Sequence, residues 1–189
     1  GTPPADPTTT KPGSAASVSP TPSAESSPTP TASATPALFD FDASVAPSRP
    51  DGLSGPPSEE TVGEAARYFV ALFPYIFATG DLAQWESVSG SDCEWCGDIA
   101  DVVRKDVAAG KRREGGRMDI QDLQVFHDRD EMYYAVVRLK EQPSRVLAAD
   151  GSVVETTDFV QDAKLEVGLG WTGETWSVTS VGVDLLGTS

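Results

Sequence analysis

The stretch from Thr61 to Cys96 constrains the fold more than any other part of the 189-residue chain, because it is the most apolar and aromatic segment. Apolar residues recur there at the i, i+3, i+4, i+7 spacing of a helix with one buried face. They are Val62, Ala65, Ala66, Phe69, Leu72, Phe73, Ile76 and Phe77. Gly80 follows them and can adopt the left-handed conformation that ends a helix. This pattern predicts a long helix that needs a large apolar surface to lie on.

Polar residues mark the starts of this helix and of two more. Thr61 with Glu64 forms a capping-box pattern for the first helix, and Ser58 is a rival cap. Asp81 predicts a second, short helix from Leu82 to about Ser89. A third helix is expected to start at Ser91 and to end at Ala109-Gly110, with a buried face made of Trp95, Ile99, Val102, Val103 and Val107.

From Arg117 onward the apolar period changes to two, which is typical of strands. A phase slip at Gln121-Asp122 indicates a bulge, and Asp150-Gly151 predicts a two-residue hairpin turn. The last strand is expected to run from Trp176 to about Asp184. The inward positions are Tyr133, Ala135, Val137, Leu139, Phe159, Ala163, Leu165 and Val167. Together these patterns predict an α+β domain in which three N-terminal helices pack on one face of a curved antiparallel sheet.

Composition divides the chain into two parts. Thirteen of its fifteen prolines lie in residues 1–57, which read as a disordered Pro/Ser/Thr/Ala-rich linker. Residues 58–189 then form the single domain. Within the linker, Ala37–Val45 carries Leu38, Phe39 and Phe41, and is either a solvated patch or a segment that docks on the domain. We expect neither a membrane-spanning run nor a signal peptide in this sequence.

The charge excludes one class of partner. The chain has a formal net charge of −15, of which −12 falls on residues 58–189. An acidic domain of this kind disfavours binding to nucleic acid or non-specifically to anionic membranes. A long linker before a folded domain is common in exported, surface-tethered proteins, so we expect the extracellular face of the cell membrane as the location.

Cys93 and Cys96 allow three interpretations: a structural disulfide, a redox pair at a helix start, or metal ligands. Export favours the disulfide, because such bonds persist in oxidising compartments. With one histidine, His127, the chain has too few ligands for a closed zinc site. No catalytic triad, phosphate loop or metal-ligand spacing is recognisable, so we predict no catalytic residue, no metal and no cofactor.

Several motifs together resemble a family of actinobacterial lipoproteins of unknown function. They are ATGD (Ala78–Asp81), SDCEWC (Ser91–Cys96), the Asp150-Gly151 hairpin and the final tryptophan strand, and the resemblance covers roughly residues 60–185. It implies a membrane tether through a lipidated cysteine upstream of the linker, and no such cysteine is in this sequence. The order of helices and strands is also similar to the cone-shaped fold of nuclear transport factor two and ketosteroid isomerase.

The cone-shaped fold implies a possible ligand pocket between helices and sheet. Candidate lining residues are Tyr68, Tyr75, Trp85, Tyr133 and Trp176, although ordinary core is the favoured interpretation of these aromatic side chains. Enzymes of this fold carry ionisable residues on the inward face, whereas the inward positions predicted here are apolar. We therefore expect a non-catalytic binding or accessory module of the cell envelope, with an unknown partner or ligand. The alternatives are a small-ligand-binding or enzymatic cone-fold protein, and a thiol–disulfide oxidoreductase using Cys93 and Cys96.

Overall fold

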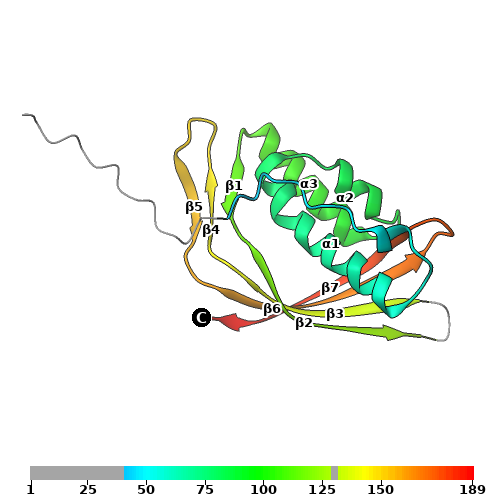
Figure 1. Cartoon of the computed structure of the whole chain (residues 1–189). Coiled ribbons are helices and arrows are strands. Elements are labelled where there is room, and N and C mark those ends of the chain that lie inside the picture. Colours follow the sequence, from blue (N-terminus) through cyan, green and yellow to red (C-terminus); the bar gives the residue numbers. More distant parts are fainter. Residues whose placement is uncertain (1–40, 129–131) are drawn as a thin grey trace, which may run out of the picture. The chain divides into compact units, whose positions relative to one another are not determined.

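The computed structural model describes residues 41–128 and 132–189. Three helices come first: α1 (Glu59–Thr79), α2 (Ala83–Val88) and α3 (Glu94–Ala108). Seven antiparallel strands follow: β1 (Arg112–Gly115), β2 (Met118–His127), β3 (Tyr133–Glu141), β4 (Ser144–Leu147), β5 (Val153–Thr157), β6 (Gln161–Trp171) and β7 (Trp176–Thr188). The predicted α+β class is therefore confirmed, with helices packed on one face of a sheet (Figure 1).

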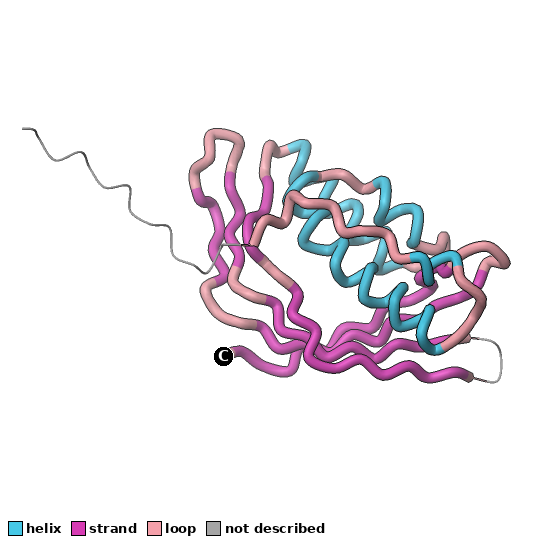
Figure 2. Tube along the Cα trace, viewed as in Figure 1, coloured by secondary structure: helices cyan, strands magenta, loops and turns pink. Residues whose placement is uncertain are grey.

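The strands form two hydrogen-bonded sheets, whereas the sequence pattern predicts one. The order is β2-β3-β6-β7 in the larger sheet and β1-β4-β5 in the smaller, which stands at one end of the helices (Figure 2). The division lies at Gly115-Gly116, where φ is +79° and +70°, and at Pro143. Gly116 N–H donates to the Pro143 carbonyl across this corner at 3.0 Å. Two glycines in the left-handed region and a proline without an N–H explain why the ladder bends there.

Helix α1 begins at a different cap from the one that Thr61 and Glu64 predicted. Ser58 is the N-cap: its Oγ accepts from Thr61 N–H and its own N–H donates to Thr61 Oγ1, both at 3.1 Å. Glu64 instead accepts a hydrogen bond from Gly52 N–H at 3.0 Å, just before α1, in the short 3-10 helix η2 (Asp51–Ser54). Gly80 ends α1 with φ +74°, as predicted.

The two shorter helices also differ from the predictions in detail. Asp81 does not cap α2 directly, since Leu82 is its N-cap, but the Asp81 carboxylate accepts from Ala83 N–H at 3.0 Å. Helix α3 starts after Cys93, not Ser91. Its buried face consists of Cys96, Ala100 and Val103. The expected burial of Val102 and Val107 is wrong, because they are 42% and 53% exposed. Val102 lies off the buried face, and Val107 lies on that face but in the last turn of the helix.

The inner face of the sheet follows the predicted alternation. Ala135, Val137 and Leu139 are at most 3% exposed, and the bulge in β2 lies between Ile120 and Asp122. Phe159 is the exception: it is 43% exposed because it precedes β6 and belongs to a loop.

Two boundaries in the sheet differ from the predictions. The Asp150-Gly151 turn has three residues, not two, because Ala148 N–H bonds the Ser152 carbonyl across Ala149–Gly151. Gly151 has the expected positive φ, +82°, which fits a three-residue loop with glycine in the left-handed position. The last strand, β7, continues to Thr188, four residues past the expected end.

The segment before α1 packs on the domain in part. Ala43 and Leu53 are 4% and 1% exposed, whereas Val45 is 68% exposed. Within the described part of Ala37–Val45, Ala43 is buried and Phe41 is half-buried, whereas the other three residues are exposed. Leu38, Phe39 and most of the predicted linker lie outside the described residues. Residues 129–131, between β2 and β3, lie outside them too. Among the helices described, none is long and apolar enough to cross a membrane.

Candidate functional site

A cavity of about 90 Å³ lies between the helices and the inner face of the larger sheet. Its helical wall is aromatic and comes from three elements: Phe69, Val70 and Phe73 of α1, Trp85 of α2 and Trp95 of α3. Its sheet wall is apolar apart from one carboxylate and consists of Met118, Leu139, Glu141, Ala163, Leu165, Val183 and Leu185. The cavity opens at β7, because Val183 and Leu185 are 41% and 70% exposed.

The aromatic wall is a stacked cluster. Phe69 stacks on Trp85 with ring centroids 4.5 Å apart, and Phe73 stacks on Trp95 at 6.1 Å. Phe69 and Phe73 are four residues apart, so one face of α1 presents both rings. Each of these offset contacts adds roughly 0.5–1.5 kcal/mol beyond area burial. The wall is therefore a pre-formed surface for an apolar group.

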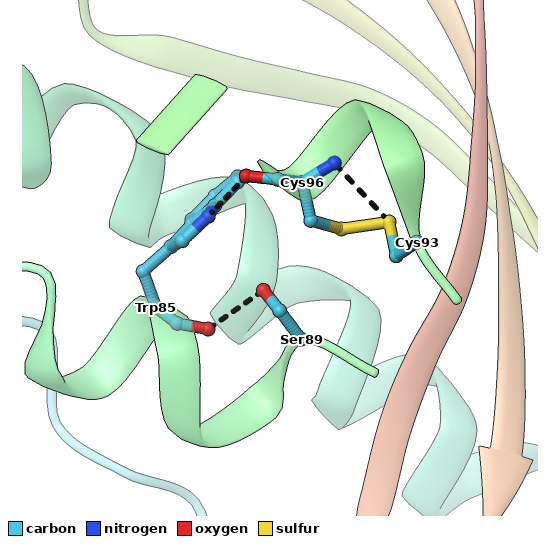
Figure 3. The surroundings of a disulfide bond; sticks show 4 residues. All are labelled: Trp85, Ser89, Cys93 and Cys96. Carbon is cyan, nitrogen blue, oxygen red and sulfur yellow. Dashed lines mark hydrogen bonds between the residues drawn. A yellow bond between two sulfur atoms is a disulfide. The ribbon is translucent and has the colours of Figure 1, made fainter. Parts of the chain in front are cut away.

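A hydrogen bond connects the aromatic wall to the disulfide. Cys93 and Cys96 are bonded, as predicted, and are 4% and 2% exposed. Trp85 Nε1 donates to the Cys96 carbonyl at 3.0 Å, so the buried indole N–H is satisfied (Figure 3). In the same view Ser89 Oγ donates to the Trp85 carbonyl at 2.7 Å. The disulfide thus holds the start of α3, and the hydrogen bond from Trp85 joins that start to α2.

A shallow hollow of about 280 Å³ lies over the disulfide and is lined by Glu86, Ser91 and Arg104 among others. The cysteines contribute almost no accessible area to it. Thiol exchange requires direct attack of a thiolate on sulfur, so this burial disfavours the oxidoreductase alternative.

Glu141 is the polar group of the cavity. It lies 3.6 Å from the Arg113 guanidinium of β1, and both side chains are about one quarter exposed, 27% and 26%. Burial raises the pKa of Glu141 above its ordinary value, and the Arg113 charge opposes this rise. Arg113 also lies over the Phe77 ring, 4.6 Å from its centroid, and its buried Nε has no hydrogen-bond partner among the described residues.

The five predicted pocket residues are divided among three places. Trp85 lines the cavity. Tyr133 and Trp176 form an edge-to-face pair at 5.1 Å, and Trp176 Nε1 donates to Thr61 Oγ1 at 3.1 Å. The hydroxyls of Tyr68 and Tyr75 bond polar side chains of the segment after α1, Gln84 and Asp81 respectively. The cavity thus takes one of the five, and the other four pack in the core or against it. Hydrogen bonds satisfy the polar ends of Tyr68, Tyr75 and Trp176.

Eleven of the twelve cavity-lining residues were not expected from the sequence to line a pocket, among them Phe69, Phe73, Trp95 and Glu141. A signal for Glu141 was present, because it continues the inward series of Ala135, Val137 and Leu139 at period two. The single histidine, His127, stacks on Tyr133 at 4.2 Å. No group of three or more potential metal-ligating side chains occurs within residues 41–128 and 132–189.

Comparisons with known proteins agree with this architecture. No curated protein matches the sequence. Among solved structures, the intermembrane space region of the chloroplast protein ARC6 is similar, with a TM-score of 0.54 and 12% identity. The match covers 69% of this chain and 99% of that region, and at this identity it concerns the fold alone. The model of DUF6318, a family of unknown function, matches residues 45–182, which is most of the chain, and the chain belongs to that family.

Proposed function

We propose that this protein is a non-catalytic binding module of the cell envelope, exported and anchored by lipid, and that the aromatic cavity is its binding site. The observation that carries the proposal is the cavity itself, with its stacked wall of Phe69, Phe73, Trp85 and Trp95. Mostly apolar pockets with few placed polar groups are the usual form of ligand sites.

The size of the cavity constrains the ligand. An engineered cavity of roughly 150 Å³ holds a benzene molecule, and this one measures about 90 Å³. It suits one small apolar group, such as an aliphatic side chain. Because the cavity opens at Val183 and Leu185, the remainder of a larger ligand would lie outside it, along β7.

The chemistry of the lining favours binding over catalysis. Among the cavity-lining residues of the described chain, Glu141 is the single titratable side chain. General acid–base catalysis needs a positioned acid or base together with groups that hold the reacting atoms. Glu141 is instead paired with Arg113, an arrangement that can orient a polar end of a ligand.

The envelope location rests on composition and on the disulfide. Residues 1–57 hold thirteen prolines, which suits a spacer between a membrane and a domain. The buried Cys93–Cys96 bond belongs to an oxidising compartment. The similar chloroplast region is described as lying in an intermembrane space, and a location outside the cytosol agrees with it.

Binding is tested with xenon as the probe, because a single apolar atom is small enough for a cavity of about 90 Å³, and it is followed by xenon NMR. The wild-type domain is expected to broaden and shift the probe signal. Ala163→Leu places extra atoms on the cavity floor and should abolish this effect, whereas Ala108→Leu adds the same atoms at an exposed site of α3. A probe signal that responds equally to wild type and Ala163→Leu would place any binding elsewhere.

The location is tested in the organism that encodes the protein. External protease should remove the domain from intact cells, and the protein should incorporate labelled palmitate. A domain that resists protease in intact cells but not in lysed cells would contradict export.

A further inference from the structure

Strand β7 has an outer edge that is open next to the cavity. In the described chain β7 lies at the end of the larger sheet, paired with β6 on one side. On the other side it receives a single extended segment, at Val178: Gly90 N–H donates to the Val178 carbonyl at 2.7 Å, and Ser89 forms a parallel bridge there. The edge thus already accepts one extended segment, and the strand continues beyond it to Thr188.

The backbone groups of the open part face outward at defined residues. Ser189 and Val160 exchange both of their backbone hydrogen bonds, at 2.9 and 3.0 Å. Hydrogen-bonded and non-hydrogen-bonded pairs alternate in an antiparallel ladder. The extra residue at the nearby register shift belongs to β7, so the alternation can be followed along β6 from Val160. Residues an odd number of positions after Val160, such as Ala163 and Leu165, then belong to non-hydrogen-bonded pairs. Their partners Leu185 and Val183 therefore direct their N–H and carbonyl groups away from the sheet.

The part of this edge that lies between the two bulges of β7 lacks the usual protection against pairing. Natural edges are blunted by proline, lysine or irregularity. Between its two register shifts, at Thr179 and Leu186, β7 runs from Val181 to Leu185 with one charge, Asp184, and no proline or lysine. The other edge strand, β2, is interrupted by its bulge at Gln121 and carries two aspartates nearby.

The same residues that open the edge also line the cavity. Val183 and Leu185 contribute side chains to its mouth and, to the edge, outward backbone groups that pair with nothing among residues 41–128 and 132–189. An added strand would place alternate side chains on the inner face of the sheet, level with this mouth. The charge of the domain favours a basic segment over a second copy of this chain as the added strand. A second copy would bring another domain of net charge −12 and would be repelled, whereas a basic segment would be attracted.

We propose that an extended segment of a partner protein pairs with β7 from Val181 to Leu185, inserts one apolar side chain into the cavity, and carries a basic residue toward Glu141. This inference rests on the proposed function and deepens it by assigning the class of partner. The proposed site has two parts. Main-chain hydrogen bonds to the β7 edge would provide affinity, and the cavity would select the side chain that it accepts.

The test uses a synthetic peptide that alternates leucine and threonine, with a lysine at each end and blocked termini. Hydrogen exchange of the Val183 and Leu185 amides is followed by NMR. Both amides should exchange quickly in the free domain and at least about tenfold more slowly with saturating peptide, because main-chain bonds would then protect them. Unchanged exchange at both amides would overturn the proposal.

Paired variants separate the main chain from the side chain. Val183→Pro removes an outward N–H without removing a bond to β6, and Val183→Thr keeps both the N–H and the branched shape. Proline should weaken peptide binding at least about tenfold, and threonine much less. If Val183→Pro does not fold, methylation of the peptide's own edge-facing nitrogens makes the same test, and a methylated peptide that binds as well as the parent would refute pairing.

Two further outcomes show whether a negative result contradicts this inference alone or changes the occupant of the edge. A wild-type domain that binds xenon but not the peptide would leave the proposed function standing and refute this inference. A domain that sediments as a dimer, with the Val183 and Leu185 amides protected before peptide is added, would replace the partner segment by a second copy.

Discussion

Trp85 Nε1 donates a 3.0 Å hydrogen bond to the carbonyl of Cys96, and this bond joins the cavity wall to the disulfide. A buried indole N–H needs an acceptor, and the Cys96 carbonyl can accept it because a carbonyl oxygen has two lone pairs and can take a second hydrogen bond beside a helical one. The Cys93–Cys96 disulfide fixes the backbone at this residue. The disulfide thereby influences the binding surface although it does not line it.

Replacing both cysteines tests this connection. Cys93→Ser with Cys96→Ser opens a very short loop, so the loss of unfolding free energy should be small, on the order of 1–2 kcal/mol. The melting temperature should fall modestly, with the secondary structure retained and tryptophan fluorescence altered. Ser89→Ala is the matched control, because it removes the 2.7 Å hydrogen bond to the Trp85 carbonyl while leaving the disulfide intact.

The same pair should be inert as a redox centre. Because Cys93 and Cys96 are almost fully buried, the native domain should resist mild reductants and should not catalyse insulin reduction. Rapid exchange with glutathione at a potential of roughly −120 to −270 mV, the range of known oxidoreductases, would instead support the oxidoreductase alternative.

The features that sequence reasoning located correctly depend on short-range physics. Gly80 ends α1 and the period-two run Ala135–Leu139 faces inward because backbone preference and pleat are local properties. The cavity depends on long-range placement. Trp95 reaches Phe73 only when α3 folds back on α1, and Arg113 reaches Glu141 only when β1 pairs with β4 instead of joining the larger sheet.

The cap of α1 is a case in which two local signals competed. Ser58, not Thr61, is the N-cap, because with Ser58 at the cap the Thr61 side chain and backbone form a reciprocal pair of hydrogen bonds with Ser58. Ser58→Ala should cost about 1 kcal/mol of unfolding free energy, the usual loss for an N-cap serine, measured by urea denaturation. Ser58→Asp retains an acceptor and should restore most of the stability. Equal stability of Ser58→Ala and wild type would mean that the helix starts elsewhere.

Gly151 provides a test of the β4–β5 loop. Its φ of +82° lies in the left-handed region, and a Cβ added there would meet no atom within 4 Å, so strain alone would penalise a side chain. Gly151→Val should therefore cost roughly 1–2 kcal/mol of unfolding free energy, measured by urea denaturation. Gly97→Ala in α3 is the counterpart, because that glycine also has open space but lies in a helix. It should stabilise the domain by roughly 0.5–1 kcal/mol.

Glu141 should make stability depend on pH in a direction opposite to that of most paired carboxylates. Burial raises the pKa of Glu141 above its ordinary value of 4.5 in the folded domain. The folded state therefore binds this proton more tightly than the unfolded chain. The stability that Glu141 contributes is complete below pH 4.5 and is lost as the pH rises through the folded pKa.

The measurement compares wild type with Glu141→Gln by urea denaturation between about pH 4 and pH 7, a window that spans the ordinary glutamate pKa. Relative to the variant, wild type should lose stability as the pH rises. Glu114→Gln is the control with the opposite sign, because hydrogen bonds from Arg145 lower the pKa of Glu114, whose contribution is lost as the pH falls. Carbon NMR of the Glu141 carboxyl provides the direct check. A titration midpoint at or below 4.5 would show that the cavity does not desolvate this carboxylate, and would remove it as the polar group of the binding site.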